Sequence, residues 1–140
     1  MAVTDTAQAP ALGASDEEVG GALLRAFFRL SELWRLTQGE QSALLGGLSR
    51  HTLMRWRDTV RRGEGIALSR DQRDRLSCLM GVHKALHIIY PYSDLVYGWV
   101  RRPHDDFGGR TPLAVMVEGG GFTDLLAVRT YLDDVRGGAG

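Results

Sequence analysis

One short pattern occurs three times in the chain: a serine or threonine followed three residues later by glutamate or glutamine. The pairs are Ser15 with Glu18, Thr37 with Glu40, and Ser69 with Gln72. In such a capping box the two side chains bond backbone N–H groups that the first turn of a helix leaves unpaired. The pattern therefore predicts the start of a helix at each of the three places.

The apolar residues that follow recur at steps of three and four, which is the spacing of one helix face. Glycine and proline mark the ends of these runs. We expect helices from Ser15 for about five turns, from Thr37 to the glycines at 46–47, from Ser49 to near Gly63, from Ser69 to Pro91, over 93–100, from Thr111 to the glycines at 119–121, and over 123–135. The stretch 101–110 is expected to be a polar loop. No segment alternates as a strand does, so the predicted fold class is all-α.

Length and composition limit the remaining possibilities. A chain of 140 residues forms one compact domain or two very small ones that share a core. The small, polar residues 1–14 and the glycine-rich residues 137–140 are expected to be flexible tails. The formal net charge is zero, which excludes a generally polybasic nucleic-acid binder but leaves room for a local basic patch.

Several kinds of site are not expected. Cys78 is the only cysteine, so we expect neither a disulfide framework nor a thiolate zinc cluster, and a small core residue instead. His83 and His87 are four residues apart on one helix face, but Lys84 disfavours a metal there, and a packed or surface pair is the preferred interpretation. We expect no catalytic residues, cofactor or metal. A secretory signal and a membrane span are also not expected, which predicts a cytoplasmic protein.

The segment from Gln41 to Arg57 matches a helix-turn-helix. Ala43 is small where two helices would cross, Gly47 stands in the turn, Ser49 caps the second helix, and Leu53 and Trp56 return to the core. Ser42 and Gly46 depart from the pattern because such units usually carry apolar residues there, which leaves open a shortened or turned first helix.

The second helix of this unit is basic. Residues 50–62 hold five arginines and one aspartate, and arginine suits forked contacts with phosphate or with guanine edges. DNA binding is therefore predicted, against the alternative of a solvated arginine-rich face on an ordinary helical hairpin. The candidate DNA-binding residues are Arg50, His51, Thr52, Arg55 and Arg57.

The last third carries an ordered set of motifs. They are Trp-Val-Arg-Arg-Pro at 99–103, Phe-Gly-Gly-Arg-Thr-Pro-Leu at 107–113, Glu-Gly-Gly at 118–120 and Val-Arg-Thr-Tyr-Leu at 128–132. Together they resemble the C-terminal domain of the Xre/MbcA/ParS antitoxin family, over roughly residues 71–136, and the preceding helix-turn-helix resembles the family's Xre-like half. Residues 15–68 are thus expected to form a DNA-binding bundle, and residues 69–136 a small helical toxin-binding domain.

The resemblance implies an antitoxin without enzymatic activity. Its usual partner is a RES-domain toxin that degrades NAD or ADP-ribosylates a protein. In this family the antitoxin covers the toxin's NAD pocket, represses its own operon, commonly dimerises and forms a larger assembly with the toxin. Gly108, Gly109 and Pro112 are expected to shape a tight turn rather than to touch the toxin. The candidate toxin-binding residues are Arg110, Arg129, Tyr131, Asp133, Asp134 and Arg136. The alternative is a dimeric transcriptional regulator without a toxin partner.

Overall fold

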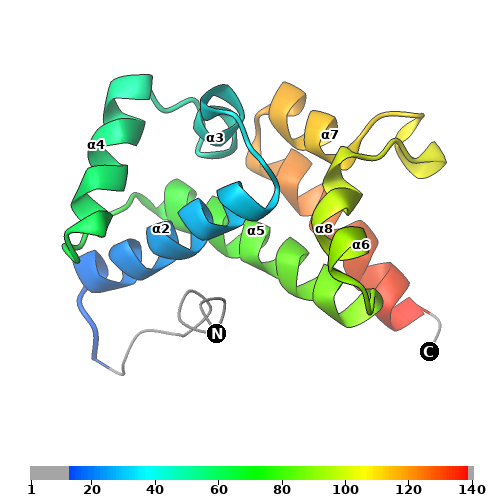
Figure 1. Ribbon diagram of the computed structural model, residues 1–140, viewed down its shortest axis with the longest axis horizontal. Coiled ribbons are helices and arrows are strands. Elements are labelled where there is room, and N and C mark those ends of the chain that lie inside the picture. Colours follow the sequence, from blue (N-terminus) through cyan, green and yellow to red (C-terminus); the bar gives the residue numbers. More distant parts are fainter. Residues whose placement is uncertain (1–12, 139–140) are drawn as a thin grey trace.

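The computed structural model describes residues 13–138, and every regular element in that range is helical. The α-helices are α2 (Asp16–Leu33), α3 (Gln38–Leu44), α4 (Arg50–Arg61), α5 (Arg70–Ile89), α6 (Ser93–Gly98), α7 (Pro112–Gly119) and α8 (Phe122–Gly138), with short 3-10 helices η1 (Trp99–Arg101) and η2 (Asp105–Phe107) (Figure 1). The predicted all-α class is confirmed. Residues 1–12 of the expected N-terminal tail lie outside the described range.

All three predicted capping boxes are formed. In each, the N-cap hydroxyl accepts a hydrogen bond from the backbone of the residue three positions later, and the carboxylate or amide of that residue accepts one from the N-cap backbone. Thr111 caps α7 with its hydroxyl alone, which accepts from the backbone N–H of Ala114, and Pro112 stands at the first helical position, where a backbone donor is not needed. Local sequence therefore determines where α2, α3, α5 and α7 begin.

One continuous apolar core runs through the described residues, from Leu24 in α2 to Leu132 in α8. Helix α5 packs against both α2 and α8, so it joins the helix-turn-helix half to the C-terminal half (Figure 1). Leu76, Leu79 and Leu86 of α5 are fully buried between them. The two regions predicted from sequence share this core.

Two arginines connect the halves through backbone carbonyls. Arg75 of α5 has only 7% of its surface exposed; its Nη2 donates to the carbonyl of Gly120 at 2.9 Å and its Nε to Asp71 at 2.8 Å. Arg101 of η1 donates through Nε to the carbonyl of Trp34 at 2.8 Å. Both guanidinium groups thereby satisfy helix-end carbonyls that would otherwise lack a partner.

The structure departs from the predicted boundaries near the C-terminus. The expected loop 101–110 contains the end of η1 and all of η2, because Trp99 and Val100 are buried and Phe107 packs against the core. Helix α8 continues through Gly138, so the tail expected from residue 137 is helical for two residues. A glycine costs a helix only about 1 kcal/mol relative to alanine, so Gly137 and Gly138 can extend α8.

Candidate nucleic-acid and protein interfaces

Helices α3 and α4 form the predicted helix-turn-helix. Gly47 has φ +88°, as expected for the turn glycine, and the preceding Gly46 is also left-handed at +93°. The carbonyl of Ser42 accepts from the backbone N–H of Gly47 at 2.8 Å and of Leu48 at 3.1 Å. A side chain at Gly46 would be strained by its φ and would crowd the Arg75 guanidinium, which explains the glycine found where an apolar residue was expected. Helix α3 is short, at seven residues.

The outward face of α4 presents Arg50, His51 and Arg55, all exposed. Thr52 is half-buried, and its hydroxyl accepts from Ser49 Oγ at 2.9 Å beside the N-cap. Leu53 and Val60 are buried on the opposite face, which fixes the rotation of α4 about its axis. The orientation leaves three of the five candidate DNA-binding side chains pointing away from the protein without obstruction.

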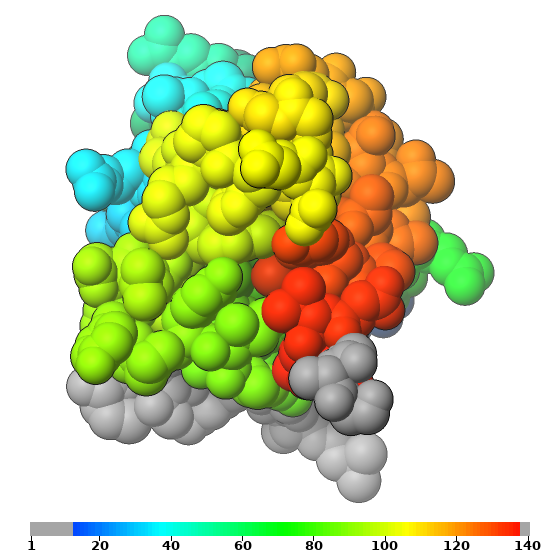
Figure 2. All heavy atoms as spheres, turned by 90° about the vertical axis from the view of Figure 1, so that its right-hand side faces the viewer, coloured from blue at the N-terminus to red at the C-terminus, as the bar shows by residue number. Residues whose placement is uncertain are grey.

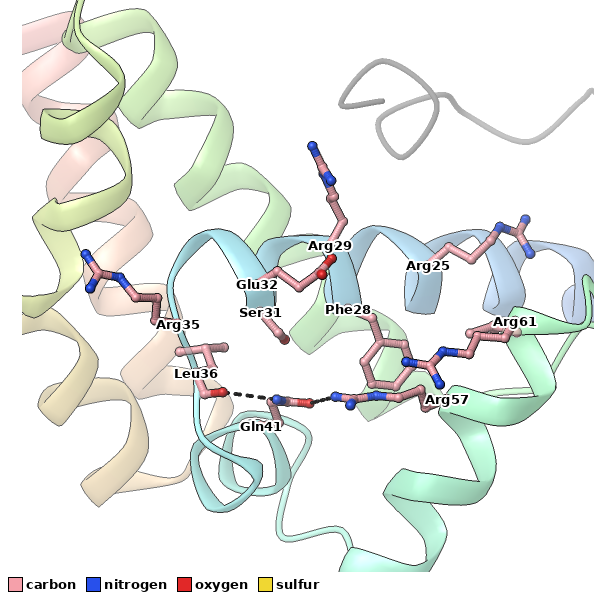
Figure 3. A pocket seen from close by; sticks show the side chains of 11 residues that line it. Arg25, Phe28, Arg29, Ser31, Glu32, Arg35, Leu36, Gln41, Arg57 and Arg61 are labelled. Carbon is pink, nitrogen blue, oxygen red and sulfur yellow. Dashed lines mark hydrogen bonds between the residues drawn. The ribbon is translucent and has the colours of Figure 1, made fainter. Parts of the chain in front are cut away.

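Arg57 of α4 is half-buried and turned toward α2. Its Nη2 donates to Gln41 Oε1 at 3.0 Å, and its guanidinium lies over the Phe28 ring, 5.2 Å from the ring centre. Gln41 in turn donates to the carbonyl of Leu36 at 3.2 Å, so the three groups form a chain across the hollow between α2, α3 and α4 (Figure 3). The helical spacing predicts Arg57 on the outward face of α4. It does not show that this arginine binds Gln41 and packs on Phe28.

Helix α8 packs on α5 through Leu125, Val128 and Leu132. Arg129 lies across Gly81 of α5, where a Cβ would come within 2.5 Å of the guanidinium carbon. Its Nε also faces Asp133 Oδ2 at 3.5 Å. Arg129, a candidate for toxin contact, therefore packs against α5, and Asp133, another candidate, pairs with it along the same helix.

Tyr131 is held by an aromatic cluster formed with Trp99, His104 and Phe107. Its ring lies 5.0 Å from Phe107 and 6.2 Å from Trp99, and its hydroxyl donates to Asp106 Oδ2 at 2.7 Å. This hydrogen bond raises the phenol pKa above its usual value. The cluster fastens the 103–110 segment onto α8.

The turn within that segment is as predicted. Gly108 and Gly109 have φ of +66° and +81°, which only glycine adopts without strain, and Pro112 is buried. These residues shape the connection between η2 and α7.

The remaining candidates lie on the surface. Arg110 is exposed and donates to Glu118 Oε1 at 2.9 Å. Asp134 and Arg136 are exposed on the last turns of α8, which lie beside α6 and the 101–110 segment (Figure 2). Sequence reasoning missed two exposed apolar residues of α8, Leu126 at 41% exposure and Val135 at 45%. A signal was available for Leu126, which lies off the stripe of Leu125, Val128 and Leu132, whereas Val135 continues that stripe and its spacing predicts burial.

His83 and His87 form a packed pair with Tyr97. The two imidazole centres are 4.5 Å apart, and the His83 ring is stacked on Tyr97 at 6.1 Å. Burial and the neighbouring His87 lower the pKa of His83 to about 4. Among the described residues, no group of three or more histidines, cysteines or carboxylates is arranged to hold a metal ion. Cys78 is buried, as predicted, and burial raises its thiol pKa.

Comparisons with known proteins agree with this geometry. Residues 4–81 match the antitoxin Xre-like helix-turn-helix domain, and residues 85–138 match the antitoxin Xre/MbcA/ParS C-terminal toxin-binding domain. The two matches meet inside α5. The chain is also 38% identical to the uncharacterised protein y4oB of Sinorhizobium fredii (strain NBRC 101917 / NGR234) over 124 residues, covering 89% of this chain and 92% of that protein. Between residues 13 and 138, no helix has the length and apolar character needed to cross a bilayer. The chain belongs to the family of antitoxins that join an Xre-like helix-turn-helix to an Xre/MbcA/ParS toxin-binding domain.

Proposed function

We propose that this antitoxin blocks the NAD-binding site of a RES-domain toxin and represses its own operon. The observation that carries the proposal is the separation of two exposed surfaces on one packed core. Arg50, His51 and Arg55 project from α4, whereas Asp134 and Arg136 project from the end of α8. The α4 surface lies in the half that matches a helix-turn-helix domain, and the α8 surface lies in the half that matches a toxin-binding domain.

The toxin contact is assigned to the outer face of α8 and the neighbouring Arg110. Asp134 offers a free carboxylate for the cationic groups with which a toxin would hold the NAD phosphates, since charge-assisted hydrogen bonds are the strong ones. Val135, the next residue along α8, adds exposed apolar area beside it. Arg129, Tyr131 and Asp133 take a supporting role, because Arg129 packs against α5, Tyr131 bonds Asp106, and Asp133 pairs with Arg129.

The DNA contact is assigned to the first turns of α4. The N-terminal residues of the second helix in such a unit reach base edges in the major groove, and Arg50 and His51 occupy those positions. Thr52 stays available for phosphate contact through its position at the helix start. A homodimer would place two copies of α4 on two half-sites of an operator.

The direct test is co-purification followed by an NAD assay. The full chain is co-expressed with a tagged RES-domain toxin from the neighbouring reading frame, and NAD consumption by the isolated toxin is measured with and without added antitoxin. We expect a stable complex, and we expect NAD consumption to stop when the antitoxin is added at a stoichiometric ratio. A chain shortened after Asp133, which keeps Leu132 in the core, is expected to bind DNA and to leave the toxin active.

A stable complex with the toxin would also exclude the second candidate function, a dimeric regulator without a toxin partner. The exposed arginines of α4 fit that function equally well. It would be supported by specific operator binding together with the absence of any complex with the neighbouring gene product.

A further inference from the structure

A groove between α2 and α4 has a strongly one-sided charge. Its walls carry Arg25, Arg29 and Arg35 from α2 and the turn after it, and Arg57 and Arg61 from α4; Glu32 is the one acidic residue in the lining. Figure 3 looks into this hollow. The net charge of the whole chain is zero, so this positive charge is local. The arginines repel one another in the isolated protein, and an anionic partner would relieve that repulsion.

The charges in this groove are available. Within residues 13–138, Arg57 donates to Gln41, whereas Arg25, Arg35 and Arg61 form no hydrogen bond and no ion pair with any described side chain. All three of those side chains are exposed. Seven arginines outside the groove pair with carboxylates or donate to carbonyls within residues 13–138, which partly compensates their charges, whereas Arg25, Arg35 and Arg61 have no such partner there.

The groove continues the face of α4 that is proposed to meet DNA. Arg50, Arg57 and Arg61 follow one another at steps of seven and four, so they share one side of the helix. Arg50 and Arg61 are about 16 Å apart along the helix axis, a distance that spans several successive phosphates of one DNA strand. A helix about 10–12 Å wide nearly fills a major groove about 12 Å wide, so its flanks lie against the sugar-phosphate backbone.

We propose that this groove binds the phosphodiester backbone of duplex DNA, through Arg25, Arg35 and Arg61, beside the site that α4 inserts into the major groove. The inference rests on the proposed DNA-binding function and adds residues outside the helix-turn-helix. In Figure 3 the guanidinium groups of Arg25, Arg35 and Arg61 are spread apart rather than gathered at one point. That spread suits a row of phosphates better than a single small anion.

The test is the salt dependence of DNA binding by the full chain. Fluorescence anisotropy is measured with two labelled duplexes of equal length, one from upstream of the protein's own coding sequence and one unrelated. The triple variant Arg25→Gln, Arg35→Gln, Arg61→Gln should bind both duplexes more weakly. The negative slope of log K against log salt should become shallower by about 2.7 for each chain bound, because each lost phosphate contact removes about 0.9.

Two matched variants separate contact from net charge. Replacing the same three arginines with lysine keeps the charges and should retain most of the slope. Replacing Arg102, Arg110 and Arg136 with glutamine removes equal charge from the C-terminal half and should leave the slope as it is in the unmodified chain. Far-ultraviolet circular dichroism confirms that each variant is folded.

The outcomes are distinguishable. An unmodified chain that binds neither duplex would overturn the DNA-binding part of the proposed function, and this inference with it. Binding by the unmodified chain with the same slope in the folded groove variant would overturn only the inference. The inference would also fail if inorganic pyrophosphate raised the melting temperature through these arginines while DNA affinity did not depend on them.

Discussion

Arg101 Nη2 donates to Glu40 Oε1 at 2.9 Å, and the same carboxylate oxygen accepts from the backbone N–H of Thr37 at 2.8 Å. The N-cap of α3 is thus completed by a guanidinium from η1, in the C-terminal half. Since Arg101 also bonds the carbonyl of Trp34 at the end of α2, one side chain fixes the turn between α2 and α3. The position of the helix-turn-helix therefore depends on the C-terminal half.

Replacing Arg101 with glutamine is expected to lower the free energy of unfolding by about 1–3 kcal/mol, because carbonyls at a helix end lose their charged donor. Urea denaturation measures the loss. Arg110→Gln is the control, since it removes an exposed ion pair worth about 0–1 kcal/mol. Equal losses in the two variants would show that Arg101 has no special role.

The sequence predicted local structure well because the signals are local. The capping boxes of Ser15, Thr37 and Ser69 bond within three residues, so reading along the chain is sufficient to find them. The left-handed turn at Gly47 and the one at Gly108 follow from the same kind of short-range constraint.

The site was predicted less completely because its determinants are distant in sequence. Arg57 meets Gln41 and Phe28, and Tyr131 meets Asp106, partners that no periodicity identifies. The groove between α2 and α4 brings arginines from residue 25 to residue 61 together, and only the packing of the helices shows it. Sequence therefore gave the positions of the helices but not the pairing of their polar faces.

Gly20→Ala is expected to lower the free energy of unfolding by about 1–3 kcal/mol. A Cβ at Gly20 of α2 would lie 1.8 Å from the backbone oxygen of Ile66, so the 63–68 connector would have to move. The matched control is Gly39→Ala in α3, which has free space around the site and is expected to stabilise by about 0.5–1 kcal/mol. Thermal unfolding of both variants checks the opposite signs, and a stabilised Gly20→Ala variant would contradict the packing described.

Tyr131→Phe and Asp106→Ala are each expected to cost about 0.5–1.5 kcal/mol, since each removes the same hydrogen bond at the surface. The double variant should cost little more than either single variant, which a double-mutant cycle in urea measures. Additive losses would mean that the two groups do not interact. Toxin neutralisation should survive Tyr131→Phe, because the ring still packs on Phe107 and Trp99.

Stability is expected to fall with acidification between about pH 6.5 and 4 through His83. Its folded pKa of about 4 lies below the ordinary 6.5, so in this window the unfolded chain binds a proton that the folded chain does not. The contribution of His83 to the free energy of unfolding is therefore fully present above pH 6.5 and decreases as the pH falls toward 4. Partial exposure of the ring limits the loss to about 1–2 kcal/mol.

The measurement is urea unfolding across that pH range. His83→Gln should have a shallower pH dependence than the unmodified chain, whereas His51→Gln, on the exposed face of α4, should retain it. A His83→Gln variant with an unchanged slope would refute the assignment to this side chain.

The central claim is that two separate surfaces of one core meet DNA and toxin. It is tested most directly by measuring both affinities, for operator DNA and for the toxin, in two folded variants: Arg50→Ala with Arg55→Ala, and the chain shortened after Asp133. We expect the first variant to lose DNA binding and keep toxin binding, and the second to do the reverse. Loss of both activities in either folded variant, or loss of the same activity in both, would contradict the account.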